Sequence, residues 1–309
     1  MARPVILLMG PTAAGKTALA LELAERIGAE IVSVDSALIY RGMDIGTAKP
    51  LPAERIRVPH HLIDIRDPEE TWSAAGFADH ARRLIGEIHG RGRVPLLVGG
   101  TMLYFRALIE GLDVMPAVDP EIRADLRARL PEEGAAALHA ELRSVDPVSA
   151  ERIHPNDPQR ILRALEIHRS TGRPLSDFQS GRTGGLPDHW HCLALLPEDR
   201  AWLRERIAQR FDAMMAAGFE GELRTLMARP CLTASHTSQR AVGYRQGWQW
   251  LAGETDYGRF RERAITATRQ LAKRQLTWLR GMGGFEPIRA EGSRVEDLLR
   301  QLPNGVLRG

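Results

Sequence analysis

Short apolar runs alternate with helix-like segments over the first hundred residues. Residues 5–9 are wholly apolar and lie between a proline and a glycine, as in a central strand of a parallel sheet. Similar runs occur at 31–34 and 94–98, and the intervening segments 16–27 and 73–89 carry apolar residues at helical spacing. This strand–helix alternation predicts a parallel α/β sheet with right-handed crossovers.

The pattern changes after residue 112. Short helices with proline at their starts replace the strands, and the next apolar strand is predicted at 192–196. Asp119 and Asp157 each precede a proline and are expected to cap helices. We therefore predict a discontinuous catalytic core made of residues 1–112 and 187–309, with residues 113–186 as a helical insertion domain. The rest of the core is predicted to be helical at 199–217, 219–228 and 256–282.

Composition narrows the class of protein. Hydrophobic residues make up 43% and charged residues 26% of the 309, which excludes a disordered or fibrous chain. No apolar run approaches the roughly 18 residues that a membrane helix needs. The two cysteines, Cys192 and Cys231, have the spacing of neither a disulfide framework nor a zinc site. We expect a cytoplasmic protein without membrane attachment.

Residues 10–17 carry the strongest chemical signal. The sequence Gly10-Pro11-Thr12-Ala13-Ala14-Gly15-Lys16-Thr17 fits the pattern G-x-x-x-x-G-K-[ST] between a predicted strand and a predicted helix. Backbone amides, the helix N-terminus and Lys16 can hold an anionic diphosphate, and the Thr17 hydroxyl can ligate Mg²⁺. The loop alone does not distinguish a nucleoside triphosphate from another organic diphosphate.

Polar side chains follow two further strands. Asp35 and Ser36 come directly after 31–34, at the edge where open α/β sheets bind ligands. Asp35 is a candidate general base, but spacing supports equally an ordinary N-cap or a carboxylate that binds the water ligands of a magnesium ion. After the third strand, Gly99 and Gly100 are expected to let a ligand approach the backbone, with the Thr101 hydroxyl facing it.

Basic residues form three further sets, although the net charge is only +3. Arg160 and Arg163 follow Gln159 on one predicted helix face. The other sets are the stacked pair Arg206 and Arg210, and, on the last helix near Trp278, Arg269, Lys273, Arg274 and Arg280. The loop 240–245 between them has an arginine–aromatic–arginine pattern suited to phosphates and stacked bases. A small substrate needs fewer cations, so a nucleic-acid substrate is favoured over a solvated basic face.

Five ordered motifs resemble those of bacterial tRNA dimethylallyltransferases. They are the phosphate loop at 10–17, the segments at 35–50, 99–104 and 241–246, and Thr-Arg-Gln-Leu-Ala-Lys-Arg-Gln-Leu-Thr-Trp at 268–278. The motifs cover nearly the whole chain. The resemblance implies a P-loop NTPase-like parallel sheet core flanked by helices, with a helical insertion domain.

The same resemblance implies an activity and assigns residues to it. The activity is transfer of a dimethylallyl group from dimethylallyl diphosphate to N6 of the adenosine on the 3′ side of the tRNA anticodon. Loop 10–17 would hold the diphosphate, Asp35 would be the base, and Thr101 and Arg210 would steady the leaving diphosphate. The residues implied to contact tRNA are Asp35, Ser36, Ala37, Leu38, Thr101, Arg123, Gln159, Arg160, Ile161, Leu162, Arg163, Arg240, Ala241, Val242, Gly243, Tyr244 and Arg245. The expected partners are the anticodon stem-loop, dimethylallyl diphosphate and Mg²⁺, bound by a monomer.

Three other functions share parts of this pattern. A P-loop kinase of nucleotides or metabolites has the same core, but it needs a nucleoside pocket and an arginine lid. An adenylate isopentenyltransferase acting on AMP or ADP needs no insertion with its own arginine face. An RNA-binding module with a nucleotide switch does not need Lys16, Asp35 and Thr101 to meet at one edge of the sheet.

Overall fold

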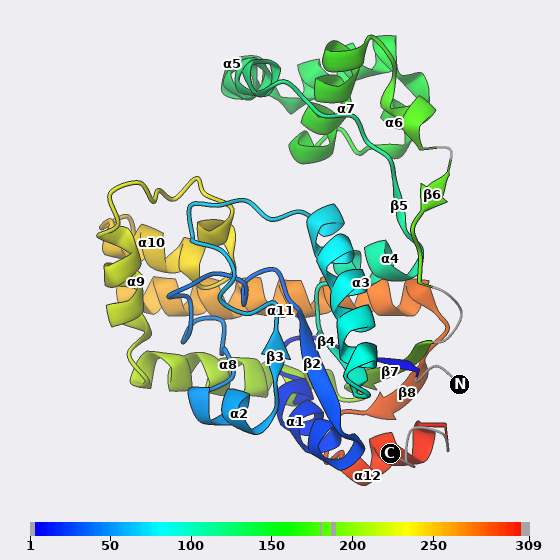
Figure 1. The fold of residues 1–309 in the computed structure, drawn as a ribbon. Helices are drawn as coiled ribbons and strands as arrows, with labels where there is room; N and C mark the ends of the chain where they lie inside the picture. Colours follow the sequence, from blue (N-terminus) through cyan, green and yellow to red (C-terminus); the bar gives the residue numbers. More distant parts are fainter. Residues whose placement is uncertain (1–3, 180, 187–189, 304–309) are drawn as a thin grey trace. The chain divides into compact units, whose positions relative to one another are not determined.

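The computed structural model describes residues 4–179, 181–186 and 190–303. The chain divides into two compact units, one formed by the residues up to Leu108 and from Leu186 onward, the other by Ile109–Gly185 (Figure 1). No helix in the described ranges is both long enough and apolar enough to cross a membrane.

The larger unit is built on a parallel sheet. Within the described ranges it has six strands in the order β3-β2-β4-β1-β7-β8. Their bounds are β1 Val5–Met9, β2 Ala29–Val34, β3 His60–His61, β4 Val94–Gly99, β7 Trp190–Leu196 and β8 Glu286–Arg289. The predicted P-loop-type α/β core is confirmed. The strands β3 and β8 were not predicted, since they are short and carry polar residues.

The register brings three chain segments to one edge of the sheet. Met9 at the end of β1 and Val34 at the end of β2 both lie beside Gly99 of β4. The segments that follow these residues, the phosphate loop, Asp35 and the Gly100–Thr101 turn, therefore meet at the carboxyl edge.

Helices cover this sheet. Helices α1 (Lys16–Ile27) and α12 (Val295–Gln301) share one apolar cluster with inward-facing side chains of β1, β4 and β7. Helix α3 (Ala74–Gly90) packs against β2 and β4. The short helix α2 (Pro52–Arg57) precedes β3, and α4 (Met102–Ile109) follows β4.

A second apolar cluster joins the C-terminal helices to the loop after β2. These helices are α8 (Arg200–Ala216), α9 (Phe219–Met227), α10 (Tyr244–Leu251) and α11 (Tyr257–Met282), with a 3₁₀ turn at Ser238–Arg240. Phe211, Phe219 and Phe260 are buried there with Ile39 and Met43. Asp199 and Asp256 cap the start of α8 and α11. Helix α11 runs behind the end of the sheet (Figure 1) and contributes directly to the pocket described below.

The smaller unit is mainly helical. It contains α5 (Pro120–Val145), α6 (Pro147–Arg152), α7 (Pro158–Thr171) and a 3₁₀ turn at Leu175–Phe178. Strands β5 (Leu112–Asp113) and β6 (Arg182–Thr183) pair antiparallel where the chain enters and leaves the unit. The predicted caps are confirmed, because the Asp119 and Asp157 side chains accept hydrogen bonds from amides of the first turns of α5 and α7.

Candidate active site

The phosphate loop connects β1 to α1 with an unusual backbone. Ala13 and Gly15 have φ angles of 65° and 95°, in the left-handed region that favours glycine. A Cβ on Gly10 would lie 2.9 Å from the Leu195 carbonyl oxygen, so glycine is required at that position too. Of the loop residues, Thr12, Lys16 and Thr17 line cavities at the carboxyl edge of the sheet.

Lys16 has a readily lost charge. Its Nζ donates a 2.8 Å hydrogen bond to the Pro11 carbonyl oxygen within the same loop. Burial and the nearby Arg210 guanidinium lower the pKa of Lys16 to about 7, and only the Asp35 carboxylate acts in the opposite direction. A bound anion would favour the charged ammonium and raise that pKa.

Two adjoining chambers lie at this edge, one of about 490 Å³ and one of about 90 Å³. The smaller chamber contains Lys16 and Thr17, and the larger opens among Arg240, Arg274 and Trp278. Residues that line both chambers are Thr12, Asp35, Thr47, Gly100, Arg210 and Gln275. Asp35 and Arg210 therefore have access to ligands in either chamber.

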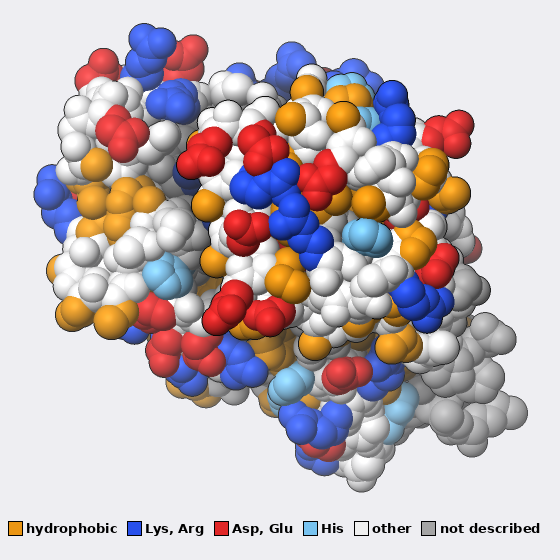
Figure 2. Space-filling view, turned by 90° about the horizontal axis from the view of Figure 1, so that it is seen from above, with side chains coloured by type: hydrophobic (Ala, Val, Ile, Leu, Met, Phe, Trp, Pro, Cys, Tyr) orange, Lys and Arg blue, Asp and Glu red, His pale blue; other side chains and the backbone are white. Residues whose placement is uncertain are grey.

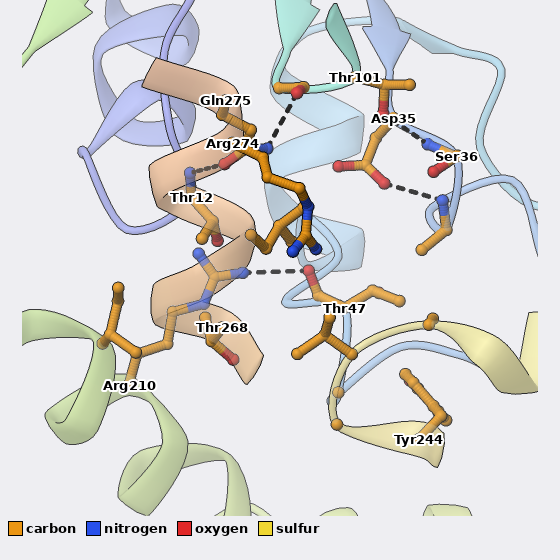
Figure 3. A pocket seen from close by; sticks show the side chains of 18 of the residues that line it. Thr12, Asp35, Ser36, Thr47, Thr101, Arg210, Tyr244, Thr268, Arg274 and Gln275 are labelled. Atoms are coloured by element: carbon orange, nitrogen blue, oxygen red, sulfur yellow. Dashed lines mark hydrogen bonds between the residues drawn. The ribbon is translucent and has the colours of Figure 1, made fainter. Parts of the chain in front are cut away.

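The two carboxylate oxygens of Asp35 have different surroundings. Its Oδ1 accepts hydrogen bonds from the amides of Ala37 at 2.8 Å and Leu38 at 3.4 Å. The second carboxylate oxygen points into the pocket (Figure 3). Beside it, the Thr101 Oγ1 accepts a 3.1 Å hydrogen bond from the Ser36 amide, which ties the ends of β2 and β4 together. The cap and a proton-accepting role are compatible because they use different oxygens.

Arg210 and Arg206 of α8 have separate tasks. Arg210 extends into the pocket, where its Nη2 donates to the Thr47 carbonyl oxygen at 3.2 Å (Figure 3). Burial lowers the pKa of the Arg210 guanidinium, and the Asp35 carboxylate opposes that effect. Arg206 instead donates from Nε to the Ala13 carbonyl oxygen at 2.9 Å and so braces the phosphate loop.

Two adjacent residues of α11 belong to the site. Arg274 was expected only as part of the basic set on the last helix, and Gln275 was not selected from the sequence. The Arg274 side chain extends into the larger chamber (Figure 3). Gln275 accepts a 2.9 Å hydrogen bond from the Thr12 amide through Oε1 and donates one of 2.9 Å to the Gly100 carbonyl oxygen through Nε2. The available signal was helical spacing, because Leu271, Arg274, Gln275 and Trp278 recur on one face and all line the chamber.

Gly99 ends β4 and Gly100 follows it. Gly99 lines the smaller chamber and Gly100 lines both, as expected for residues that let a ligand approach the backbone, and both also serve protein packing. A Cβ on Gly99 would overlap the Val34 carbonyl oxygen. A Cβ on Gly100 would lie 2.5 Å from the Gln275 Nε2.

The expectation of one basic cluster on the last helix is wrong. Arg269, Lys273 and Arg280 line a different surface groove of about 380 Å³, together with Arg200 and Arg204 of α8. Of these four cations, Arg274 alone lines the larger chamber, because it follows Lys273 by one residue and so lies about 100° around the helix from it.

The residues of the loop 240–245 also lie at two different places. Arg240, Ala241, Val242 and Gly243 line the larger chamber, whereas Arg245 lines a separate hollow with residues of α10 and α11. The Tyr244 ring was expected to stack on a base, but it is 0% exposed and packs edge-on against Phe219 at a centroid distance of 5.1 Å. Burial and the Glu222 carboxylate raise the pKa of Tyr244 well above its usual value. Tyr244 therefore shapes the chamber wall from within the core.

In the helical unit, the predicted residues fall into exposed and buried sets. Arg123 of α5 and Arg163 of α7 both pair with the buried Glu166 carboxylate, at 3.5 and 3.6 Å. Gln159 and Arg160 are exposed. The side chains of Ile161 and Leu162 are buried in the apolar core of the unit, so they cannot present themselves to an RNA.

The surface charge is mixed. On the face shown in Figure 2, Lys and Arg side chains lie among Asp and Glu side chains, with no continuous basic surface.

Comparison with known proteins identifies the family. A family model described as IPP transferase matches residues 38–282. A tRNA dimethylallyltransferase from Thioalkalivibrio sulfidiphilus is 58% identical over 292 residues, which cover 94% of this chain and 91% of the relative. Another from Halorhodospira halophila is 54% identical over 310 residues and covers 100% of both chains.

Solved structures agree with these relatives. The tRNA isopentenylpyrophosphate transferase from Bacillus halodurans is 36% identical, with a TM-score of 0.69 over 99% of this chain and 97% of that one. A eukaryotic dimethylallyltransferase acting on tRNA is 27% identical, with a TM-score of 0.78 over 94% of this chain and 74% of that one. The resemblance inferred from the motifs is thus confirmed, and the chain belongs to the IPP transferase family.

Proposed function

We propose that this protein transfers the dimethylallyl group of dimethylallyl diphosphate to N6 of the adenosine on the 3′ side of the tRNA anticodon. The observation that carries the proposal is the junction of the two chambers at Asp35 and Arg210. One chamber offers the phosphate loop, and the other is large enough for a nucleoside. The names of the relatives support tRNA as the acceptor.

The smaller chamber suits the leaving diphosphate. Lys16 supplies an ammonium, loop amides supply neutral donors, and Arg210 adds a guanidinium from α8. These groups are held in place before reaction and face the region where charge develops as the carbon–oxygen bond breaks. The Thr101 hydroxyl lines the larger chamber beside them and can donate its proton to a ligand oxygen.

Mg²⁺ fits this donor set. The Thr17 hydroxyl is an oxygen ligand beside the diphosphate position, and Mg²⁺ in such sites is held by few protein oxygens together with substrate phosphates. When bound, the ion would neutralise part of the diphosphate charge.

The larger chamber suits an adenosine that has left its base stack. A duplex or stacked base cannot reach a buried reactive atom, so enzymes of this kind flip the target nucleotide into a pocket. Met102, Val242 and Trp278 offer apolar and aromatic surface for the base, and Arg240 and Arg274 offer charge for neighbouring phosphates.

The reaction in this site is an alkylation. The bond between C1 of the dimethylallyl group and the diphosphate oxygen breaks, and its electron pair leaves with the diphosphate. The N6 lone pair forms the new carbon–nitrogen bond, and the N6 proton passes to the free oxygen of Asp35. Since the N6 lone pair is delocalised into the adenine ring, removal of that proton assists the attack.

The helical unit would bind the RNA outside the pocket. Arg123, Gln159, Arg160 and Arg163 supply polar and charged side chains on two neighbouring helices.

Acceptor preference tests the proposal. Purified protein would be given dimethylallyl diphosphate with either AMP or an unmodified anticodon stem-loop, and prenylated adenosine would be measured for each. We expect transfer to the stem-loop at low concentration and none to AMP. Transfer to AMP alone would make the protein an adenylate isopentenyltransferase, and transfer of phosphate from ATP would make it a kinase.

A further inference from the structure

We infer that Gln275 is a positioning residue that fixes the phosphate loop relative to the strand ends carrying Thr101 and Asp35. The inference rests on the proposed function for its catalytic consequence. Its geometric basis is independent of that function, since the side-chain amide bonds directly to the Thr12 amide and to the Gly100 carbonyl oxygen.

Both the oxygen and the nitrogen of the Gln275 side-chain amide form hydrogen bonds, one as acceptor and the other as donor. The oxygen can accept from the Thr12 N–H, and the nitrogen can donate to the Gly100 carbonyl, at 2.9 Å in both cases. A glutamate in the same position could still accept from Thr12, but it would place a carboxylate against the Gly100 carbonyl. A methionine has a similar length but can replace neither hydrogen bond.

The surrounding sequence is built for this contact. A Cβ on Gly100 would lie 2.5 Å from Nε2 of Gln275 and 3.1 Å from the Gly10 carbonyl oxygen. Glycine at position 100 thus leaves the space that the amide occupies. The helix that carries Gln275 is itself anchored, because Ala272 and Leu279 in the adjacent turns are buried.

The contact is part of a series of hydrogen bonds and neighbouring residues that links the diphosphate side of the site to Asp35, the proposed general base. The series runs from Thr12 through Gln275 to Gly100, then through the adjacent Thr101, whose Oγ1 accepts from the Ser36 amide next to Asp35. Loss of the two Gln275 hydrogen bonds would allow the distance between the phosphate loop and Asp35 to change. A misplacement of about 1 Å between reacting groups costs about 100-fold in rate.

The test compares Gln275→Met with Gln270→Ala, an exposed glutamine in the same helix that lines neither chamber. We expect Gln275→Met to lower kcat by about 10- to 100-fold and to weaken pyrophosphate binding several-fold. Its tRNA affinity should stay within about twofold and its melting temperature should match that of Gln270→Ala. Wild-type kcat and wild-type pyrophosphate affinity in Gln275→Met would overturn the inference, as would a loss of activity matched by a loss of folded protein.

A double-mutant cycle adds a second readout. Gly100→Ala should disturb the same contact, so adding Gln275→Met to it should cost little more. Independent, additive effects on pyrophosphate binding would contradict the inference. If the wild-type protein transferred no dimethylallyl group, the proposed function would fail, and the pyrophosphate titration would still decide the role of Gln275.

Discussion

The Tyr244 hydroxyl donates a 2.5 Å hydrogen bond to Oε1 of Glu222, a carboxylate from α9. The same carboxylate accepts from the consecutive amides of Asp44, Ile45 and Gly46, at 2.6 to 3.0 Å. One side chain therefore holds the loop after β2 against the helix that carries Tyr244. Thr47, whose carbonyl oxygen accepts a hydrogen bond from Arg210, directly follows Gly46 in the same loop.

Removing the Glu222 carboxylate should destabilise the larger unit. Glu222→Ala leaves three amides and a buried hydroxyl without their partner, and we expect the free energy of unfolding to fall by about 3 kcal/mol. Tyr244→Phe removes one donor to a charged group and should cost about 2 kcal/mol. Denaturant unfolding measures both. Glu220→Gln, at an exposed pair on the same helix, serves as control and should cost below about 0.5 kcal/mol.

These contacts mark the limit of what the sequence could predict. The strands at 5–9, 31–34 and 94–98, the phosphate loop and the Asp-Pro helix starts depend on local patterns, and the structure has them where expected. The burial of Tyr244 depends on Phe219 and Glu222, which no local pattern connects to it. Gln275 meets Thr12 across 263 residues of chain. Its neutral side chain carries no chemical signal, and the direction in which a helix faces is set by packing.

The charge of Lys16 should respond to ligand binding. Its pKa of about 7 means that the side chain is mostly neutral near pH 8, and a bound anion raises that pKa. Binding of pyrophosphate near pH 8 should therefore take up a proton, and affinity should fall as pH rises above about 7. Calorimetry in buffers of different ionisation enthalpy measures the uptake. Subtracting the proton uptake measured with Lys16→Ala removes the contribution of pyrophosphate protonation. Equal proton uptake in both proteins would show that Lys16 is not the group that becomes protonated.

Replacing Arg160 should affect only tRNA binding, whereas replacing Arg163 should affect both tRNA binding and the stability of the helical unit. Each phosphate contact contributes a slope of about −0.7 to −0.9 to log K against log[salt]. Arg160→Gln should reduce the slope for tRNA binding by about that amount with little change in stability, since its side chain is 68% exposed. Arg163→Gln should also destabilise the helical unit, because it removes one of the partners of the buried Glu166.

The control for this pair is Arg143→Gln, which removes the same charge from an exposed position of α5. We expect it to leave the salt slope unchanged. If Arg160→Gln also left the slope unchanged, Arg160 would be part of an ordinary solvated helix face.

Asp35→Asn should remove the proposed proton acceptor while keeping the size of the side chain. A positioned base contributes about 10²- to 10⁴-fold, so Asp35→Asn should lower the single-turnover rate by that factor at saturating tRNA. The asparagine oxygen can still cap the turn at Ala37, which should preserve the fold. If Asp35 only ordered Mg²⁺, raising the magnesium concentration would restore the rate, and pyrophosphate binding would weaken together with it.

The central claim is that one site joins a diphosphate chamber to an adenosine chamber for transfer to tRNA. The most direct measurement incubates the protein with labelled dimethylallyl diphosphate and unmodified tRNA, digests the RNA to nucleosides and locates the label. We predict that the label lies in N6-(dimethylallyl)adenosine derived from the position on the 3′ side of the anticodon, with one diphosphate released per transfer. Unlabelled tRNA under these conditions, or label on another nucleoside, would contradict the account.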